Sequence, residues 1–256
     1  MKRIYEAATG WIHTRWLGGL QAAFIVRSLN VQSALRQHPP PEGGRVLDAG
    51  CGEGASLPAL LARRFPRARF VAVDLFIGGP RSRPRAPRPP NLDLWERDIL
   101  RISLDAPFDI IYALDLLEHV EDAGAVLKIF LERMRPGGQL YLHTPSAGQF
   151  HFFKGAQEGE CPAFRKERKG DKHLREGFSP EELSALVASA GFREIDLRHT
   201  FSPITWFFKE LFTLCERRRF PGIGLLLMPF ISAGACWDRL IPPRRGNGLW
   251  VEATKP

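Results

Sequence analysis

The sequence predicts an α/β fold with a doubly wound, mostly parallel sheet, and three observations predict it. Short apolar runs alternate with helical stretches from Arg45 onward, a glycine-rich turn follows the first run, and acidic residues stand where several runs end. Strands that alternate with helices form parallel sheets with helices on both faces. The chain has 256 residues, 44% of them hydrophobic, which is enough for one sizeable core. We expect a single domain over residues 1–256.

Residues 1–41 predict an N-terminal helical cap. Apolar and aromatic side chains recur there at three- and four-residue spacing, and Pro39-Pro40-Pro41 ends the pattern. The first residues lack the apolar run of a secretory signal, and no segment reaches the length of a membrane span. The four cysteines show no CxxC spacing. We therefore expect a reducing, cytoplasmic location.

Residues 42–200 are expected to form the core of the domain. Its alternating elements are RVLDAG, SLPALLARRF, RFVAVDL, FDIIYAL, VLKIFLERM, GGQLYLHT and REIDLRHT, in that order. Ser179-Pro180-Glu181-Glu182 is a capping box with proline at the first helical position, and Gly191 stands where that helix should end. Residues 243–256 contain GLWVEATK, whose alternation predicts the last strand.

Two segments interrupt the alternation. The first, GGPRSRPRAPRPP, carries five prolines and four arginines, and proline at that density excludes a helix. It is either an irregular, solvated connection or a flap that contacts an anion. The second, residues 201–242, is unusually apolar and predicts a helical insertion before the last strand.

Three interpretations of this insertion remain open: a helical pair that extends the core, a lid over a greasy substrate, and an interfacial membrane anchor. Arg217, Arg218 and Arg219 follow its first apolar face, and Pro229 interrupts the second. The net charge of +8 and the pI near 9.7 favour an anionic partner. Peripheral contact with an anionic membrane, at its inner face, fits this charge.

The turn VLDAGCGEG predicts a nucleotide-binding site, because a strand that runs into G-x-G-x-G brings backbone amides to a helix N-terminus. The glycines alone also satisfy a variant of the dinucleotide fingerprint. Asp48 helps to decide, since its carboxylate would repel a pyrophosphate but could accept hydrogen bonds from an ammonium group. Asp74 is placed to accept ribose hydroxyls, and Asp98 could meet an adenine amino group. These acids fit an adenosine that bears an amino acid.

Together, VLDAGCGEG, FVAVDL, RDIL, FDIIYALDLLEHVED and MRPGGQLYLHTPS resemble the class I S-adenosylmethionine-dependent methyltransferases. The downstream HLREGFSPEELSALVASAGF is similar to a subgroup that includes ubiquinone-pathway O-methyltransferases. The resemblance implies a seven-stranded sheet with the last strand antiparallel, and S-adenosyl-L-methionine as the cofactor. The cofactor contacts that it implies are Asp48, Gly50, Cys51, Gly52, Asp74, Leu75, Asp98, Ile99 and Leu114.

Methyl transfer from a sulfonium needs an aligned nucleophile and a group that removes its proton. His119, just beyond the fourth strand, is the first candidate for this base, and His143 and His151 are the others. His119 has an alternative, structural interpretation as a helix-start histidine that bonds to the backbone.

A divalent metal is a further hypothesis for the same motif. Asp115, Glu118 and His119 can lie on one side of a helical turn, and His173 is the nearest further ligand. The pattern resembles the metal site of small-RNA 2′-O-methyltransferases and of some ubiquinone-pathway enzymes, although LEHV also occurs in relatives that use no metal. Such ligands suit Mg²⁺ or Mn²⁺.

The sequence thus predicts an S-adenosylmethionine-dependent biosynthetic enzyme that methylates a hydrophobic small molecule. The expected reaction is O-methylation of a phenolic, quinol-like, glycolipid or other natural-product intermediate. The alternatives are a nucleic-acid methyltransferase and a non-catalytic, membrane-associated binding module. Nucleic acid fits less well, because the arginine-rich segment lacks interleaved stacking aromatics. Asp48 also argues against a nicotinamide oxidoreductase.

Overall fold

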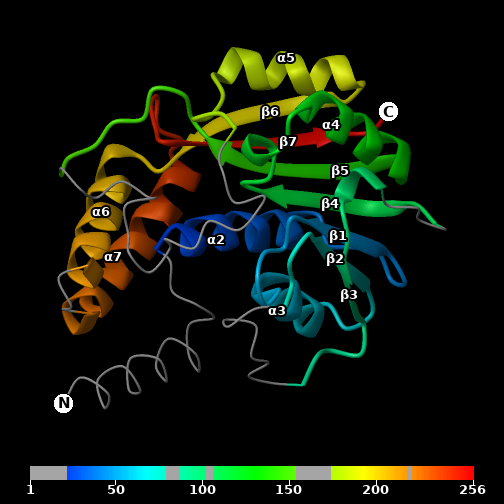
Figure 1. Cartoon of the computed structure of the whole chain (residues 1–256), viewed down its shortest axis with the longest axis horizontal. Coiled ribbons are helices and arrows are strands. Elements are labelled where there is room, and N and C mark those ends of the chain that lie inside the picture. The colour runs from blue at the N-terminus through cyan, green and yellow to red at the C-terminus, as the bar shows by residue number, and fades with distance from the viewer. Residues whose placement is uncertain (1–21, 79–86, 102–105, 154–173, 218–220) are drawn as a thin grey trace.

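A computed structural model describes residues 22–78, 87–101, 106–153, 174–217 and 221–256 (Figure 1). Its centre is a seven-stranded sheet in the order β3-β2-β1-β4-β5-β7-β6. The strands are β1 (Arg45–Ala49), β2 (Arg69–Asp74), β3 (Leu92–Glu96), β4 (Phe108–Leu114), β5 (Met134–Pro145), β6 (Arg193–Thr200) and β7 (Gly248–Thr254). Strands β1 to β5 pair in parallel, and β7 lies antiparallel between β5 and β6. The predicted doubly wound sheet with an antiparallel last strand is confirmed.

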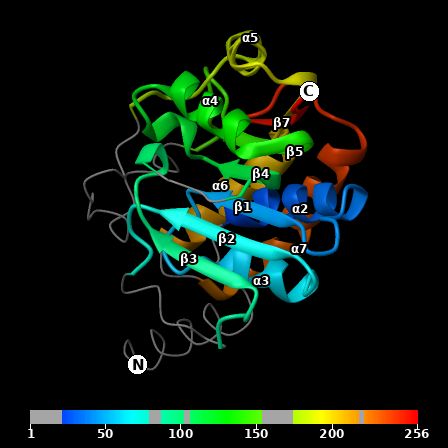
Figure 2. The same ribbon diagram turned by 90° about the vertical axis from the view of Figure 1, so that its right-hand side faces the viewer.

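Helices cover both faces of this sheet (Figures 1 and 2). They are α2 (Ala22–Gln37), α3 (Ser56–Arg64), α4 (Ala123–Arg133), α5 (Pro180–Ala190), α6 (Pro203–Arg217) and α7 (Pro221–Leu240). Helices α4 and α5 pack on one face, and α3 with the C-terminal half of α2 packs on the other. Strands buried on both faces need nearly continuous apolar runs, which explains why RVLDA and RFVAVD are mostly apolar.

The connection into and out of α5 forms as the sequence predicts. The Ser179 hydroxyl accepts a hydrogen bond from the backbone N–H of Glu182 at 3.0 Å, and Pro180 occupies the first turn. Gly191 ends the helix at φ 110°. A Cβ there would lie 2.8 Å from Cδ2 of Leu131, so glycine is required for close packing as well as for the backbone.

The predicted helical cap and the predicted helical insertion pack against each other. Helices α6 and α7 connect the end of β6 to the start of β7, so they rise from the edge at which the parallel strands end, hereafter the carboxyl edge. Ala22, Ala23 and Val26 of α2 share a buried cluster with Trp206 of α6 and with Ile231 of α7. Residues 1–21 of the predicted cap lie outside the described residues. None of the helices that the structure describes is long and apolar enough to cross a membrane.

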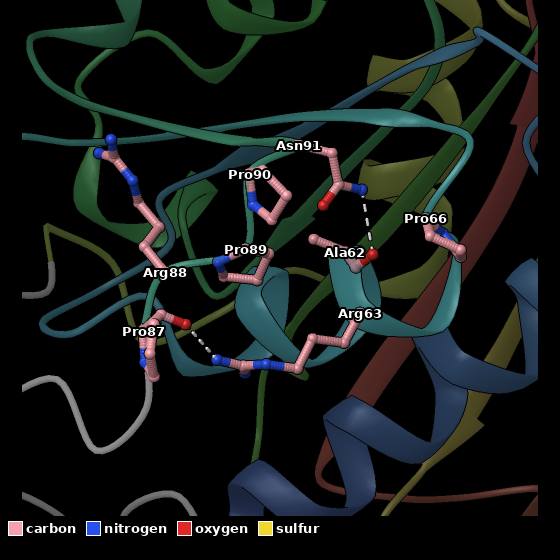
Figure 3. A pocket seen from close by; sticks show the side chains of 8 residues that line it. All are labelled: Ala62, Arg63, Pro66, Pro87, Arg88, Pro89, Pro90 and Asn91. Carbon is pink, nitrogen blue, oxygen red and sulfur yellow. Dashed lines mark hydrogen bonds between the residues drawn. The ribbon is translucent and has the colours of Figure 1, made fainter.

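The proline- and arginine-rich segment falls partly outside the described residues, which resume at residue 87. From there the chain runs without a helix into β3. Its last residues and the end of α3 line a surface pocket of about 390 Å³ (Figure 3). The Asn91 amide donates hydrogen bonds to the carbonyls of Ala62, Phe65 and Ala68, and these bonds hold the segment against α3.

Candidate functional site

The glycine-rich turn lies at the carboxyl edge between β1 and α3. Gly50, Gly52 and Gly54 adopt φ of 78°, 68° and 85°, which favours glycine, and Ala55 follows at φ 43°. The backbone N–H groups of Gly50 and Cys51 both donate to the carbonyl of Val73, so the turn is fixed to the end of β2. The chain therefore reverses tightly in front of the sheet and leaves the start of α3 facing the same edge.

Asp74 joins the end of β2 to the turn. One carboxylate oxygen accepts from the Gly52 N–H at 2.8 Å, and the other accepts from the Phe76 N–H at 3.0 Å. The carboxylate is therefore held in one orientation at the carboxyl edge. Each oxygen has a second acceptor site, which suits it to bind hydroxyl groups.

Asp48 lies beneath the turn, in β1, and is 3% exposed. Burial raises the pKa of its carboxyl to about 8; the hydroxyl of the neighbouring Tyr112 opposes this rise, and the charge of Asp74 adds to it. A buried carboxyl of this kind gives up its proton when a cation comes within reach. The site is therefore suited to a ligand that carries a positive charge near the turn.

Cys51 lies in the same turn, and its thiol is expected to be unreactive. Burial, together with the carboxylates of Asp48 and Asp74, raises the pKa of the thiol far above its usual range. A thiol that keeps its proton is neither a nucleophile nor a strong ligand. Cys51 therefore contributes its backbone and its bulk to the turn.

The structure gathers the predicted cofactor contacts at the ends of β1, β2, β3 and β4, which are neighbours in the sheet. Asp98 follows β3 and accepts from the Leu100 N–H at 3.0 Å, and Ile99 is buried beside it. Leu75 is exposed after β2, and Leu114 is half-buried at the end of β4. Together with Asp48, Gly50, Cys51, Gly52 and Asp74, these residues line one continuous edge, although the sequence separates them widely.

A buried polar network lies beside this edge. Asp115, directly after β4, contacts the guanidinium of Arg27 from α2 and lies 2.6 Å from Nδ1 of His143 in β5. Nε2 of His143 lies 3.1 Å from the hydroxyl of Thr200 at the end of β6. Burial alone would raise the pKa of Asp115, but the charges of Arg27 and His143 outweigh it and hold the pKa below its usual value. The network thus joins the cap helix to three strands.

His143 is therefore a buried residue of this network and does not face solvent as a free base would. Its side chain is 2% exposed, and both ring nitrogens have protein partners. Gly248 closes over it, since a Cβ there would lie 2.5 Å from the Thr200 hydroxyl and 2.7 Å from Nε2 of His143. In this arrangement the buried His143 ring positions Asp115 and does not face solvent.

His119, the first candidate for the base, lies in the short 3₁₀ turn Leu117–His119 just beyond β4. Its ring is half-buried, and its charge acts on Asp115. The preceding Glu118 is fully buried and accepts from the Thr144 hydroxyl at 3.3 Å. Burial and the charge of Asp115 raise the pKa of Glu118 well above its usual value, which favours the neutral form of this carboxyl.

The predicted metal site does not form among the residues that the structure describes, since they contain no group of three or more His, Cys, Asp and Glu side chains able to hold an ion. Asp115 is engaged by Arg27 and His143, and burial favours the neutral form of Glu118, so the arrangement favours neither carboxyl as an anionic ligand. His173, the fourth predicted ligand, lies outside the described residues. The four-ligand site, which includes His173, therefore stays a prediction.

His151, the last candidate base, is bound to the insertion instead. Its Nδ1 lies 2.8 Å from a carboxylate oxygen of Glu210 in α6. The indole N–H of Trp206 donates to the same oxygen, and the backbone N–H groups of Phe152 and Phe153 donate to the other. Glu210 is fully buried, so it fixes the segment after β5 to α6.

The pocket of Figure 3 is not this site. It lies where β3 begins, at the opposite end of the strand from the carboxyl edge. Apart from Arg63, Arg88 and Asn91, its lining is proline and alanine, and the Arg63 guanidinium donates to the carbonyl of Pro87. The pocket therefore offers no acid or base for chemistry.

Sequence reasoning missed Arg27, Thr200 and Glu210. Arg27 stands within the apolar run FIVRSL, and an arginine there can either face solvent or cross a core. Thr200 and Glu210 have partners on other elements, and no local pattern identifies these partners. One signal in the sequence could have found Arg27. Helix α2 is expected to be partly buried, and a charged residue on the buried face of a helix requires a partner.

Comparison with known proteins identifies relatives of the chain. Residues 24–197 match the family described as "Methyltransferase domain". A ubiquinone biosynthesis O-methyltransferase of Xanthomonas axonopodis pv. citri is 29% identical over 170 residues, which cover 61% of this chain and 66% of that protein. A trans-aconitate 2-methyltransferase of Azoarcus sp. is 33% identical over 119 residues, or 46% of each protein. The matches therefore span about half to two thirds of these curated relatives.

Solved structures share the fold. Phosphoethanolamine N-methyltransferase 2 of Haemonchus contortus, in complex with phosphomonomethylethanolamine and S-adenosylhomocysteine, superposes with a TM-score of 0.59 at 16% identity and covers 89% of this chain and 52% of that chain. The [4+2]-cyclase SpnF superposes with a TM-score of 0.55 at 19% identity and covers 90% of this chain and 80% of its own. At these identities the likeness concerns the fold.

Proposed function

This chain belongs to the class I S-adenosyl-L-methionine-dependent methyltransferases, and on that premise we propose that it transfers the methyl group of S-adenosyl-L-methionine to an oxygen of a hydrophobic small molecule. The observation that carries the proposal is the arrangement of Asp48, the glycine turn and Asp74 at the carboxyl edge. The acceptor class rests on the side chains around that edge and on the relatives named above.

The residues at the turn fit the cofactor. A Cβ on Gly52 would meet no described atom within 4 Å, so open space lies in front of the turn. Asp48 is available for an ammonium group, and the oriented carboxylate of Asp74 is available for ribose hydroxyls. Backbone amides and carboxylates are the donor and acceptor set that an adenosine bearing an amino acid requires.

The bound cofactor supplies a methyl group on a sulfonium, which is a good leaving group. The chain then has to orient the acceptor oxygen and take its proton. His119 is the residue that we assign to this task, because it follows β4, the strand next to β1, and carries a half-buried imidazole. The anionic Asp115 nearby favours the protonated ring that results.

An apolar acceptor is supported by a series of aromatic side chains at the same edge. Phe152, in the segment after β5, contacts Phe207 of α6 with ring centroids 5.6 Å apart. Phe153 contacts Phe207 at 5.5 Å, and Phe207 contacts Phe208 at 5.5 Å. These rings form a hydrophobic surface that suits an apolar substrate. The ubiquinone biosynthesis O-methyltransferase relatives support an oxygen acceptor of phenolic or quinol-like type.

Calorimetry with S-adenosylhomocysteine tests the cofactor site. We expect Asp74→Ala to weaken binding by about 30- to 150-fold, because a charge-assisted bidentate contact contributes about 2 to 3 kcal/mol. Asp93→Ala, at an exposed acid within β3, is the matched control and should bind like the parent. If the parent does not bind, or if Asp74→Ala binds as tightly as the parent, the proposed site is wrong.

The acceptor class needs a separate assay. The parent is incubated with radiolabelled S-adenosyl-L-methionine and either a prenylated catechol or the matching aromatic amine. We expect label in the catechol and a loss of at least about a hundredfold in His119→Ala, which is the lower range of general-base contributions. Label in the amine alone would overturn O-methylation while leaving methyl transfer intact.

A further inference from the structure

Helix α7 and the residue after it carry five exposed, large apolar side chains, which we call the α7 stripe. Its members and their exposed fractions are Leu226 (71%), Phe230 (55%), Trp237 (59%), Leu240 (77%) and Ile241 (56%). At about 100° per residue, these positions fall within an arc of about 100° on one side of the helix. Ile241 continues the helical pattern, because its N–H donates to the carbonyl of Trp237 at 2.8 Å.

The packing of α7 is already satisfied by its other side. Ile231 and Ala235 are buried in the cluster shared with α2 and α6. Asp238 is 3% exposed, and its carboxylate accepts from the Ser202 N–H at 2.9 Å. Phe230 also stacks on Phe208 of α6, with ring centroids 5.2 Å apart. More than half of each stripe side chain nevertheless stays exposed, and large apolar side chains gathered on a surface mark a contact with something else.

The charge around the stripe is positive. Between residues 221 and 245 the sequence has one acid, the buried Asp238, against Arg239, Arg244 and Arg245. Arg244 and Arg245 are exposed directly after the stripe, and the guanidinium of Arg245 lies 5.2 Å from the ring centroid of Phe150. An apolar row that is followed by exposed arginines, in a stretch whose one acid is buried, is complementary to an apolar phase bordered by anions.

We propose that the α7 stripe docks the protein on an anionic lipid surface. The apolar side chains enter the boundary between head groups and acyl chains, and Arg244 and Arg245 contact the phosphates. A second copy of this helix suits the surface less well, since residues 221–245 offer these arginines no exposed acid. The inference goes beyond the proposed function, because docking requires neither cofactor nor acceptor.

Vesicle flotation of the full chain tests the proposal. Vesicles of phosphatidylcholine alone are compared with vesicles that contain phosphatidylglycerol, at low and high salt. We expect binding that rises with phosphatidylglycerol and falls with salt. Leu240→Ser should lower the partition coefficient at least about tenfold, because the burial of one leucine is lost. Leu60→Ser, at an exposed leucine of α3, is the matched control and should float like the parent.

A double variant tests the electrostatic contribution to lipid binding. We expect Arg244→Glu with Arg245→Glu to lower partition by about thirtyfold or more, since each basic residue near an anionic surface accounts for about a fivefold gain. Arg64→Glu with Arg67→Glu makes the same charge change at exposed positions outside the α7 stripe and should have little effect. Brominated lipids should quench the tryptophan fluorescence of the parent more than that of Trp237→Phe.

Three results would overturn the proposal. The first is that the parent fails to float. The second is that it floats equally well when Leu240 or the two arginines are replaced, which would place lipid binding elsewhere on the chain. The third is that light scattering finds a dimer that Leu240→Ser dissociates, which would show that the stripe binds a second copy. A failed methyl-transfer assay would leave all of these readouts unaffected, so failure here and failure of the proposed function can be told apart.

Discussion

Nδ1 of His143 lies 2.6 Å from a carboxylate oxygen of Asp115, and the Asp115 N–H donates to the His143 carbonyl at 2.9 Å. The two residues are thus joined through both backbone and side chain at the carboxyl edge. Asp115 adopts φ of 50°, which non-glycine residues seldom do, and such a conformation persists when its surroundings hold it. The turn that carries His119 begins directly after this fixed point.

Asp115→Asn tests the energetic weight of the network. Asparagine tolerates the left-handed backbone but removes the negative charge opposite Arg27 and His143. We expect the free energy of unfolding to fall by about 3 kcal/mol at pH 7, as measured by urea denaturation. Asp196→Asn, at an exposed acid 3.8 Å from Arg198, is the control and should change it by less than about 0.5 kcal/mol.

The same pair gives a pH prediction. The folded pKa of Asp115 lies below its unfolded value, so its stabilisation is present above about pH 4 and is lost as the pH falls through the folded pKa. The parent should therefore lose more stability than Asp115→Asn on acidification. Parallel acid titration curves for the two proteins would contradict this role.

Gly248→Ala is expected to act mainly on stability, and Gly52→Ala mainly on ligand binding. A methyl group at Gly248 would lie 2.5 Å from the Thr200 hydroxyl and 2.7 Å from the His143 ring. It should destabilise the fold by about 2 to 3 kcal/mol. At Gly52, with φ of 68° and open space, the cost should be about 1 kcal/mol, from the backbone alone. The Gly52 variant should nevertheless bind S-adenosylhomocysteine at least about tenfold less tightly, since the methyl group enters the ligand space.

Asp48 should make the cofactor-free protein less stable as the pH rises. Its carboxyl keeps its proton in the folded state up to about pH 8, whereas the unfolded chain releases it near the ordinary value of 3.8. Between these values the folded state binds more protons, so the unfolding free energy falls with pH. Thermal denaturation of Asp48→Asn should show a flatter dependence. A steeper one would contradict the assigned protonation.

Ligand binding should favour the ionised form of Asp48 instead. Because an ammonium group favours the ionised carboxylate, binding of S-adenosylhomocysteine below about pH 8 should release a proton. Calorimetry in two buffers of different ionisation enthalpy measures that release directly. The affinity of the parent should increase with pH up to about 8, and Asp48→Asn should show neither the increase nor the proton release.

Glu210→Gln tests the anchor of the segment after β5. The carboxylate accepts from His151, Trp206 and the N–H groups of Phe152 and Phe153, whereas an amide turns one acceptor into a donor. We expect a loss of about 2 to 3 kcal/mol. Hydrogen exchange at the Phe152 and Phe153 amides should also become faster. Glu182→Gln, at an exposed acid paired with Arg175, provides the control.

Local chemistry in the sequence determined the alternation of strands and helices, the glycine turn, the cap at Ser179 and the placement of Asp48, Asp74 and Asp98. These features depend on neighbours within a few residues. In a parallel sheet, residues at strand ends meet at one edge, whatever separates them in the chain. The edge that holds the predicted cofactor contacts was therefore predictable from the sequence.

Tertiary packing alone decided which of the candidate groups are engaged. Asp115 and Glu118 have the spacing of metal ligands, but Arg27 of α2 pairs with the first, and burial raises the pKa of the second. His143 and His151 are held by Thr200 and Glu210, which belong to β6 and α6. The sequence likewise showed that the insertion is apolar, but only the packing of α6 and α7 on α2 showed which side stays exposed. Protonation and exposure depend on neighbours brought together by the fold, and no local spacing encodes those neighbours.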